Sequence, residues 1–230
     1  MPAGTSRLFV NIDGFAYLAF MQQDWELAAA KCAPGSVLDP ARVTQDRNQR
    51  VLLWQIHPDG TYRSTVVEES SARGPLSDPF DVGQPTGSLI PDGLGGVLLS
   101  VGWAHISDRN DGSRPPDEFI YRLDQDGRVV YQLALPYEGP LRDEMVLGEK
   151  NGFATRGSLL IAFDIADGRE MWRWDAHTPR IEVFAALANG GCMVQTPAAL
   201  IEVDSATEAK EIFKGKAMID WHGQLYRQSN

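Results

Sequence analysis

The densest group of potential ligand side chains lies in the segment HISDRNDGSRPPDE. Within it, Asp108, Asn110 and Asp111 place side-chain oxygens close together, and oxygen is the ligand atom that Ca²⁺ prefers. The run is one residue shorter than the calcium loop D-x-[DN]-x-[DN]-G and lacks the distal glutamate of that loop. A solvated, turn-rich loop therefore explains the segment better than a calcium site, which stays the secondary interpretation.

Motifs for nucleophilic or metal-assisted catalysis are not found in the sequence. No serine lies in a G-x-S-x-G motif, and the histidines do not form an H-E-x-x-H pair. These histidines are His57, His105, His177 and His222. Cys32 and Cys192 lie far apart without a paired spacing, which favours two buried free thiols over a disulfide or a zinc site. No catalytic residue is predicted, although a site assembled from several repeats would escape a linear search.

Aromatic and arginine side chains next to the same loops favour recognition over catalysis. Trp25, Trp103, His105 and Arg109 lie in or beside long connecting segments, and tryptophan and arginine are common anchors of binding surfaces. They predict a non-catalytic module that recognises a protein segment or a glycan. The alternative interpretation of Trp25 and Trp103 places both side chains in the core.

The overall charge narrows the range of partners. The chain has 230 residues and a formal net charge of −10, which disfavours a nucleic acid or an anionic membrane as the main partner.

No apolar stretch approaches the roughly 20 residues of a membrane-spanning helix. The opening MPAGTSRLFV lacks the charged and then apolar regions of a secretion signal.

A repeat organises the whole chain. Asp124, Asp164 and Asp204 follow one another at intervals of forty residues, each at a turn between two strand-like runs, and a looser copy has its turn at Asp59. Two more strand-like runs precede each copy. Four antiparallel strands in about 40 residues are typical of one blade of a β-propeller. The sequence therefore predicts one all-β domain, 1–230, with blades over 6–69, 86–136, 144–176 and 182–214 and a partial blade over 216–230.

The segment AFDIADGREMWRW predicts how blades dock on one another. Trp172 and Trp174 point to one side of the same strand, and together they offer a large apolar surface. Because a blade cannot bury both of its faces alone, we expect these tryptophans to pack against the next blade. Asp164 and Gly168 shape the turn before them.

Departures from the repeat predict a functional face. The first two blades carry insertions between their second and third strands, and an Ala-rich stretch before Pro34 could form a turn or two of helix. In an antiparallel blade this connection emerges at the same edge as the link to the next blade. The predicted binding face is therefore built by residues 21–50, 70–87 and 104–118.

The stretch AFDIADGREMW resembles the A-x-D-x-x-T-G-x-x-x-W repeat of the quinoprotein-like β-propellers, with Asp167 where threonine is usual. This family includes pyrroloquinoline-quinone dehydrogenases and outer-membrane assembly scaffolds. The resemblance implies blade docking by Trp172 and a bacterial protein of the periplasm or cell exterior. It leaves a quinone-dependent dehydrogenase with calcium, or a lactonase-like hydrolase, as the alternative function. No adjacent cysteines and no matching acidic set occur, so no cofactor is predicted.

The C-terminal stretch KAMIDWHGQLYRQSN predicts two further strands, which would form half of a blade. Closed propellers commonly complete a terminal blade with strands from both ends. We therefore expect an incomplete ring whose missing strands and further blades come from a longer parent chain. The competing hypothesis is a small closed ring of five blades.

Overall fold

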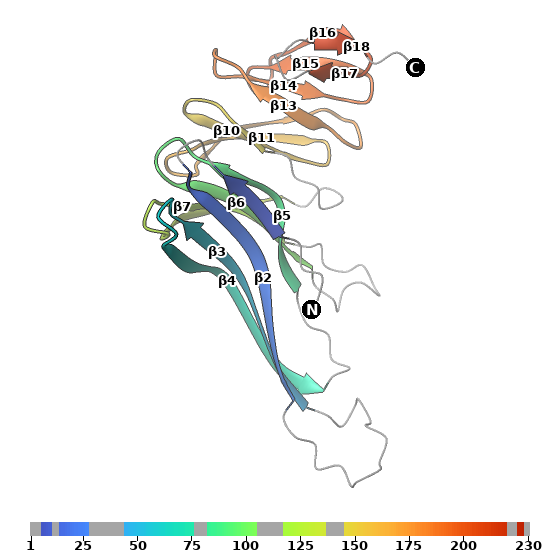
Figure 1. Ribbon diagram of the computed structural model, residues 1–230. Coiled ribbons are helices and arrows are strands. Elements are labelled where there is room, and N and C mark those ends of the chain that lie inside the picture. Colours follow the sequence, from blue (N-terminus) through green and yellow to red (C-terminus); the bar gives the residue numbers. More distant parts are fainter. Residues whose placement is uncertain are drawn as a thin grey trace.

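The computed structural model describes residues 6–10, 14–27, 44–75, 82–104, 117–136, 145–219 and 225–227. Regular structure in these residues is entirely β, in four four-stranded antiparallel sheets and one hairpin. Figure 1 shows their arrangement. Each sheet has its strands in sequence order, and the described part of the chain contains no helix that could span a membrane.

The strand bounds follow the repeat. The first sheet comprises β1 (Ser6–Val10), β2 (Ala16–Leu27), β3 (Thr44–Ile56) and β4 (Tyr62–Pro75), and the second comprises β5 (Val82–Pro91), β6 (Val97–Ala104), β7 (Asp117–Leu123) and β8 (Val129–Leu135). The third comprises β9 (Met145–Leu147), β10 (Asn151–Arg156), β11 (Leu159–Asp164) and β12 (Glu170–Asp175). The fourth comprises β13 (Glu182–Ala186), β14 (Cys192–Gln195), β15 (Ala199–Val203) and β16 (Ala209–Lys214), and β17 (Ala217–Ile219) pairs with β18 (Leu225–Arg227). The all-β class with four-stranded antiparallel sheets is thus confirmed.

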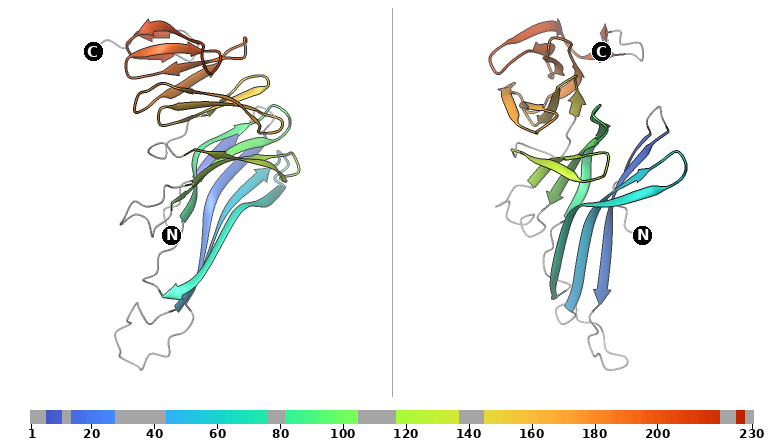
Figure 2. Two further views of the ribbon diagram at one scale, coloured as in Figure 1. Left: turned by 180° about the vertical axis from the view of Figure 1, so that it is seen from behind. Right: turned by 90° about the vertical axis from the view of Figure 1, so that its left-hand side faces the viewer.

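The sheets follow one another along an open stack. The first sheet and the β17–β18 hairpin lie at opposite ends of it, as the views in Figures 1 and 2 agree. A ring in which β1 and β17 occupy adjacent blades is therefore not formed by the described strands.

Strands in the first two sheets extend into segments that were predicted as loops. Residues 21–27, 44–50, 70–75 and 82–87 all belong to strands, with Trp25 opposite Arg47 and Arg47 opposite Ala72. Their polar composition favoured loops, but backbone pairing does not require apolar side chains. The helical turn expected before Pro34 lies outside the described residues.

Three apolar clusters hold the stack together, and each draws on two consecutive sheets. Tyr17 and Leu53 of the first sheet pack with Leu99 of the second. Leu98 of the second packs with Phe163 of the third. Because neighbouring residues of a strand point to opposite faces, Leu98 and Leu99 serve different clusters. Each of the two middle sheets therefore buries both of its faces.

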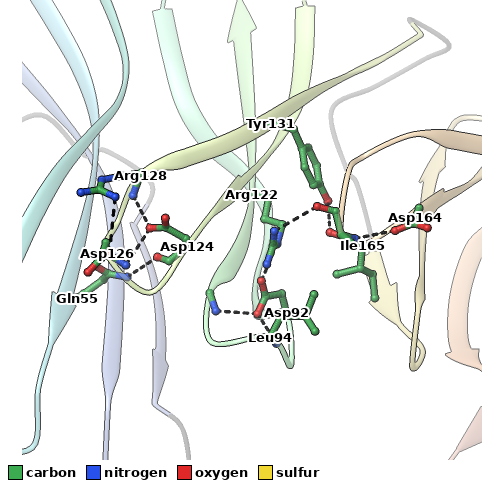
Figure 3. A network of polar contacts seen from close by, with 12 residues as sticks. Gln55, Asp92, Leu94, Arg122, Asp124, Asp126, Arg128, Tyr131, Asp164 and Ile165 are labelled. Atoms are coloured by element: carbon green, nitrogen blue, oxygen red, sulfur yellow. Dashed lines mark hydrogen bonds and ion pairs between the residues drawn. The ribbon is translucent and has the colours of Figure 1, made fainter.

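Hairpin turns add a second kind of contact between sheets. The turn before β12 reaches back to Tyr131 of β8, whose hydroxyl donates to the carbonyl oxygen of Ile165 at 3.1 Å (Figure 3). Gly168 lies against this ring with φ at 73°, and a Cβ there would come within 2.5 Å of Tyr131. Glycine is needed for both the backbone conformation and the close approach.

The motif residues from the sequence lie at this turn and beyond it. The Asp164 carboxylate accepts a hydrogen bond from the Ala166 amide at 2.8 Å and so shapes the turn. Trp172 and Trp174 are half-buried in the cluster between the third and fourth sheets. The Trp172 ring lies 5.9 Å from that of Phe153, centroid to centroid. The structure thus places both tryptophans at an interface between sheets.

A fully buried ion pair joins the second sheet to the third. The Arg156 guanidinium on β10 donates to the Glu118 carboxylate on β7, and both side chains have an exposed fraction of 0%. Removing one partner of such a pair leaves a buried charge without its counter-ion, whereas replacing both by apolar groups avoids that cost.

We predict that Trp172→Ala lowers the free energy of unfolding by about 3 kcal/mol, because it truncates a large packed aromatic side chain. Met171→Ala, on the neighbouring residue with 44% exposure, is the control and should change it by less than about 0.5 kcal/mol. Chemical denaturation measures both. Equal losses for the two variants would contradict the docking role.

We predict that Glu118→Ala destabilises the fold by about 3 to 5 kcal/mol, because the Arg156 charge stays buried. The double variant Glu118→Leu, Arg156→Met should recover much of this loss, since neither charge is then buried. The free energy of unfolding from denaturant titration is again the measurement. A double variant no more stable than the single one would show that the pair itself contributes net stability.

Candidate binding cleft at the turn edge

A cleft of about 450 Å³ lies between the first and second sheets, at the edge where the hairpin turns emerge. We call it the turn cleft. Its lining residues come from four hairpin connections (β1–β2, β3–β4, β5–β6 and β7–β8) and from strands β2, β3 and β4. They are Phe15, Tyr17, Gln55, His57, Arg63, Gly95, Gln125 and Asp126. Side chains from far along the sequence therefore meet here because the two sheets pack face to face.

The turn between β7 and β8 supplies one wall. The Asp124 carboxylate accepts hydrogen bonds from the backbone amides of Asp126 at 2.8 Å and Arg128 at 2.9 Å. Aspartate commonly caps a turn in this way, and Gly127 supplies the positive φ, here 73°. The capped turn holds Gln125 and Asp126 at the rim of the cleft.

The first sheet anchors this turn through polar contacts (Figure 3). The Gln55 amide is 4% exposed and donates to the carbonyl oxygen of Asp124 at 3.4 Å. Gly127 lies so close to the first sheet that a Cβ would come within 2.5 Å of the Thr65 hydroxyl. The position of the turn is thus fixed from the side of the first sheet.

An ion pair spans the mouth of the cleft. Arg63 on β4 lies 3.3 Å from the Asp126 carboxylate, and the two side chains are 47% and 51% exposed. An ion pair at this exposure contributes little to stability because water screens it. It leaves both groups accessible to a ligand while it keeps the net charge of the pair at zero.

Aromatic rings form the opposite wall. The rings of Phe15 and His57 meet edge to face, with centroids 5.0 Å apart. Tyr17 is 8% exposed. Burial, followed by the negative charge of Asp92, raises the pKa of the Tyr17 hydroxyl above its ordinary value. The phenol is therefore neutral near pH 7 and can both donate and accept a hydrogen bond.

Asp92 belongs to a polar layer behind the cleft. Its carboxylate accepts from the amides of Leu94 and Gly96 at 2.7 and 2.8 Å and pairs with Arg122 at 2.8 Å. Arg122 in turn donates to the carbonyl oxygen of Ala166 at 3.2 Å (Figure 3). These contacts fix the turn between β5 and β6, which contributes Gly95 to the cleft.

A smaller hollow of about 150 Å³ lies at the opposite edge of the fourth sheet. It is lined by Arg180, Glu182, Gln195, Thr196, Pro197 and Lys216. Ligand sites usually enclose about 300 to 1,000 Å³, so the turn cleft is the better candidate for ligand binding.

Two of the ligand-binding residues predicted from the sequence lie on described strands, away from the turn cleft. Trp25 lies on β2 and Trp103 on β6, at the opposite edge, and the structure describes only their backbones. His105, Asp108, Arg109, Asn110 and Asp111 lie outside the described residues. Within the part of the chain that the structure describes, no three metal-ligating side chains gather into a site.

Sequence reasoning missed the turn cleft because its lining residues are spread over four hairpin connections and three strands. The carboxylate of Asp124 caps the turn between β7 and β8. The side chain of Asp126 instead faces Arg63 of the preceding sheet. The available signal was the repeat itself, since stacked sheets bring successive turns to one edge.

Cys192 is a buried free thiol. It is buried in the cluster between the third and fourth sheets. Burial, together with the nearby charge of Asp204, raises the pKa of the thiol to about 12. Because only the thiolate is nucleophilic, Cys192 is a packing residue. Cys32 lies outside the described residues.

Comparison with known proteins does not assign the chain to a family. No family model matches it, and no curated protein matches it. Among solved structures, a protein of unknown function from Bacteroides caccae aligns with 78% of this chain and 65% of its own, at 12% identity and a TM-score of 0.36. The aligned part thus spans slightly less than two thirds of that protein. The relationship to quinoprotein-like propellers stays a prediction.

Proposed function

We propose that this chain is a non-catalytic binding module, built on a propeller-like stack of blades, that recognises a glycan segment in the turn cleft. One observation carries the proposal. A cleft of about 450 Å³ is lined by aromatic rings, side-chain amide groups and an accessible ion pair. This volume falls within the range of about 300 to 1,000 Å³ that ligand sites commonly enclose.

The lining groups match the chemistry of a sugar. A pyranose ring has apolar C–H faces and an edge of hydroxyl groups, each of which can donate and accept. Phe15 and Tyr17 offer apolar ring surface. Gln125 both donates and accepts, Arg63 donates and Asp126 accepts. Such a set can hydrogen-bond to hydroxyl groups of a neutral sugar, and the Arg63–Asp126 pair adds no net charge to the site.

The same lining supports binding over hydrolysis. Of the lining residues that the structure describes, none is a serine, cysteine or lysine that could act as a nucleophile beside His57. The Asp126 carboxylate lies 3.3 Å from the Arg63 guanidinium and is engaged in an ion pair with it.

Other expectations from the sequence stay predictions. These are recognition through the face built by residues 21–50, 70–87 and 104–118, the periplasmic or extracellular location, the protein segment as ligand and the further blades of a longer parent chain. The alternative functions, a quinone-dependent dehydrogenase with calcium and a lactonase-like hydrolase, also stay predictions.

We predict that a panel of neutral di- to tetrasaccharides contains a ligand that binds at the turn cleft, measured by isothermal titration calorimetry. Arg63→Ala and Gln125→Ala should each weaken this binding about tenfold, since each removes a hydrogen bond of roughly 1.4 kcal/mol. Arg173→Ala is the matched control, because Arg173 is 51% exposed and paired with Glu170 on the outer strand of the third sheet. It should leave the affinity unchanged.

The possible outcomes distinguish an error in the proposed ligand class from an error in the proposed binding site. Binding of a peptide library member instead of a sugar, lost in the Arg63 and Gln125 variants, would keep the cleft and replace the ligand class. Sugar binding that survives both variants would move the site away from the turn cleft. The absence of binding to either panel would contradict the proposed function.

A further inference from the structure

Gln55 and Arg122 occupy the same position in the first and second sheets. They lie on β3 and β7, two residues before the turn residues His57 and Asp124. Each donates a hydrogen bond to a backbone carbonyl oxygen in a turn of the following sheet, Gln55 to Asp124 and Arg122 to Ala166. The interface between the first and second sheets can therefore be compared, position by position, with the interface between the second and third.

In the second of these interfaces, Arg122 bridges two turns. Its guanidinium pairs with Asp92 of the β5–β6 turn at 2.8 Å and donates to the carbonyl oxygen of Ala166 in the β11–β12 turn at 3.2 Å (Figure 3). The side chains of Arg122 and Asp92 are 11% and 0% exposed. The space between these two turns is thus occupied by a side chain of the protein itself.

The corresponding space in the first interface is the turn cleft. It lies between the β1–β2 connection, which contributes Phe15, and the β7–β8 turn, which contributes Gln125 and Asp126. Glutamine is shorter than arginine, and the Gln55 amide ends at the beginning of the β7–β8 turn, 3.4 Å from the carbonyl oxygen of Asp124. This side chain therefore does not bridge the two turns as Arg122 does.

The neighbouring residues on the second strand do not account for the cleft. Tyr17 in the first sheet corresponds to Leu98 in the second, because each lies opposite the compared residue on the adjacent strand. Phe15 corresponds in the same way to Gly96, two residues earlier. In both cases the first sheet has the larger side chain, which narrows the space.

The neighbouring residues on the fourth strand do not account for it either. Arg63 corresponds to Tyr131, because each is the cross-strand partner of the compared residue, and each covers a turn glycine of the following sheet. A Cβ on Gly127 would lie 3.5 Å from Cδ of Arg63, and a Cβ on Gly168 would lie 2.5 Å from the Tyr131 ring. Of the positions compared, Gln55 is the one at which the bridge between the turns is lost.

We propose that Gln55 is the residue that makes the first interface a ligand site, because its short side chain leaves room for one ring of the glycan between the β1–β2 and β7–β8 turns. This inference rests on the function proposed above. The sugar ring takes the place that the Arg122 guanidinium has in the next interface. Both groups have a face for apolar or aromatic contact and an edge of hydrogen-bond donors. Phe15 lies on one side of this place and Gln125 on the other.

The variant Gln55→Arg places the residue of the second interface in the first. For a neutral sugar from the panel, isothermal titration calorimetry should show binding at least about 100-fold weaker, because the guanidinium occupies the place of the ring and its contacts are lost. Charge repulsion does not contribute, since the sugar is neutral. Gln55→Ala leaves the space open and should weaken binding by less than about tenfold.

Met171→Arg is the matched control. It adds the same charge on β12, at a side chain with 44% exposure, and should leave the affinity unchanged. Equal losses for Gln55→Ala and Gln55→Arg would show that Gln55 acts by direct contact with the ligand and would overturn the inference. Unchanged affinity in Gln55→Arg would overturn it as well.

A crystal structure of the Gln55→Arg variant without sugar gives a result that does not depend on the ligand class. The introduced guanidinium should lie in the turn cleft, between Phe15 and the β7–β8 turn, with the melting temperature no lower than that of the parent. A guanidinium directed out of the cleft would refute the role of Gln55. If no sugar binds the parent, the proposed function fails, and the position of this guanidinium still decides whether Gln55 keeps the cleft open.

Discussion

The structure depends on the close approach of two hairpin turns, β7–β8 and β11–β12, to the sheet that precedes each of them. At Gly127 and Gly168 a Cβ would come within 2.5 Å of Thr65 or Tyr131 of the preceding sheet. Side chains of the preceding sheet hold these turns in place by donating hydrogen bonds to carbonyl oxygens of the turns. Gln55 and Tyr131 are the donors. Both the apolar clusters and the turn cleft follow from this contact, because it sets the separation of the sheets at their turn edge.

The number and order of the sheets could be predicted because turn chemistry is local. An aspartate that caps a turn and a glycine with positive φ leave a recognisable spacing, and alternation of apolar residues on either side indicates strands. Strand length could not be predicted in the same way. Residues 44–50 and 70–75 are polar, yet their backbones are paired, and pairing of polar backbone segments leaves no pattern of side-chain types.

The candidate site was harder to predict than the fold. Tryptophans and a loop rich in ligand atoms favoured the edge with long connections, whereas the cleft that the structure shows lies at the edge with short turns. Gln55 and Arg63 look unremarkable in the sequence because their importance comes from facing the next sheet. That relation depends on how two repeats stack, which the spacing within one repeat does not specify.

Each apolar cluster draws on only two consecutive sheets. This restriction affects how cooperatively the molecule unfolds. In such an arrangement stability is a sum of terms for single repeats and for neighbouring pairs. The fourth sheet can therefore lose its order while the first three remain folded, and the cooperative unit of unfolding can be smaller than the chain. The buried Glu118–Arg156 pair lies at the middle interface, between the second and third sheets. Separation of the stack into two halves at this interface would break the pair.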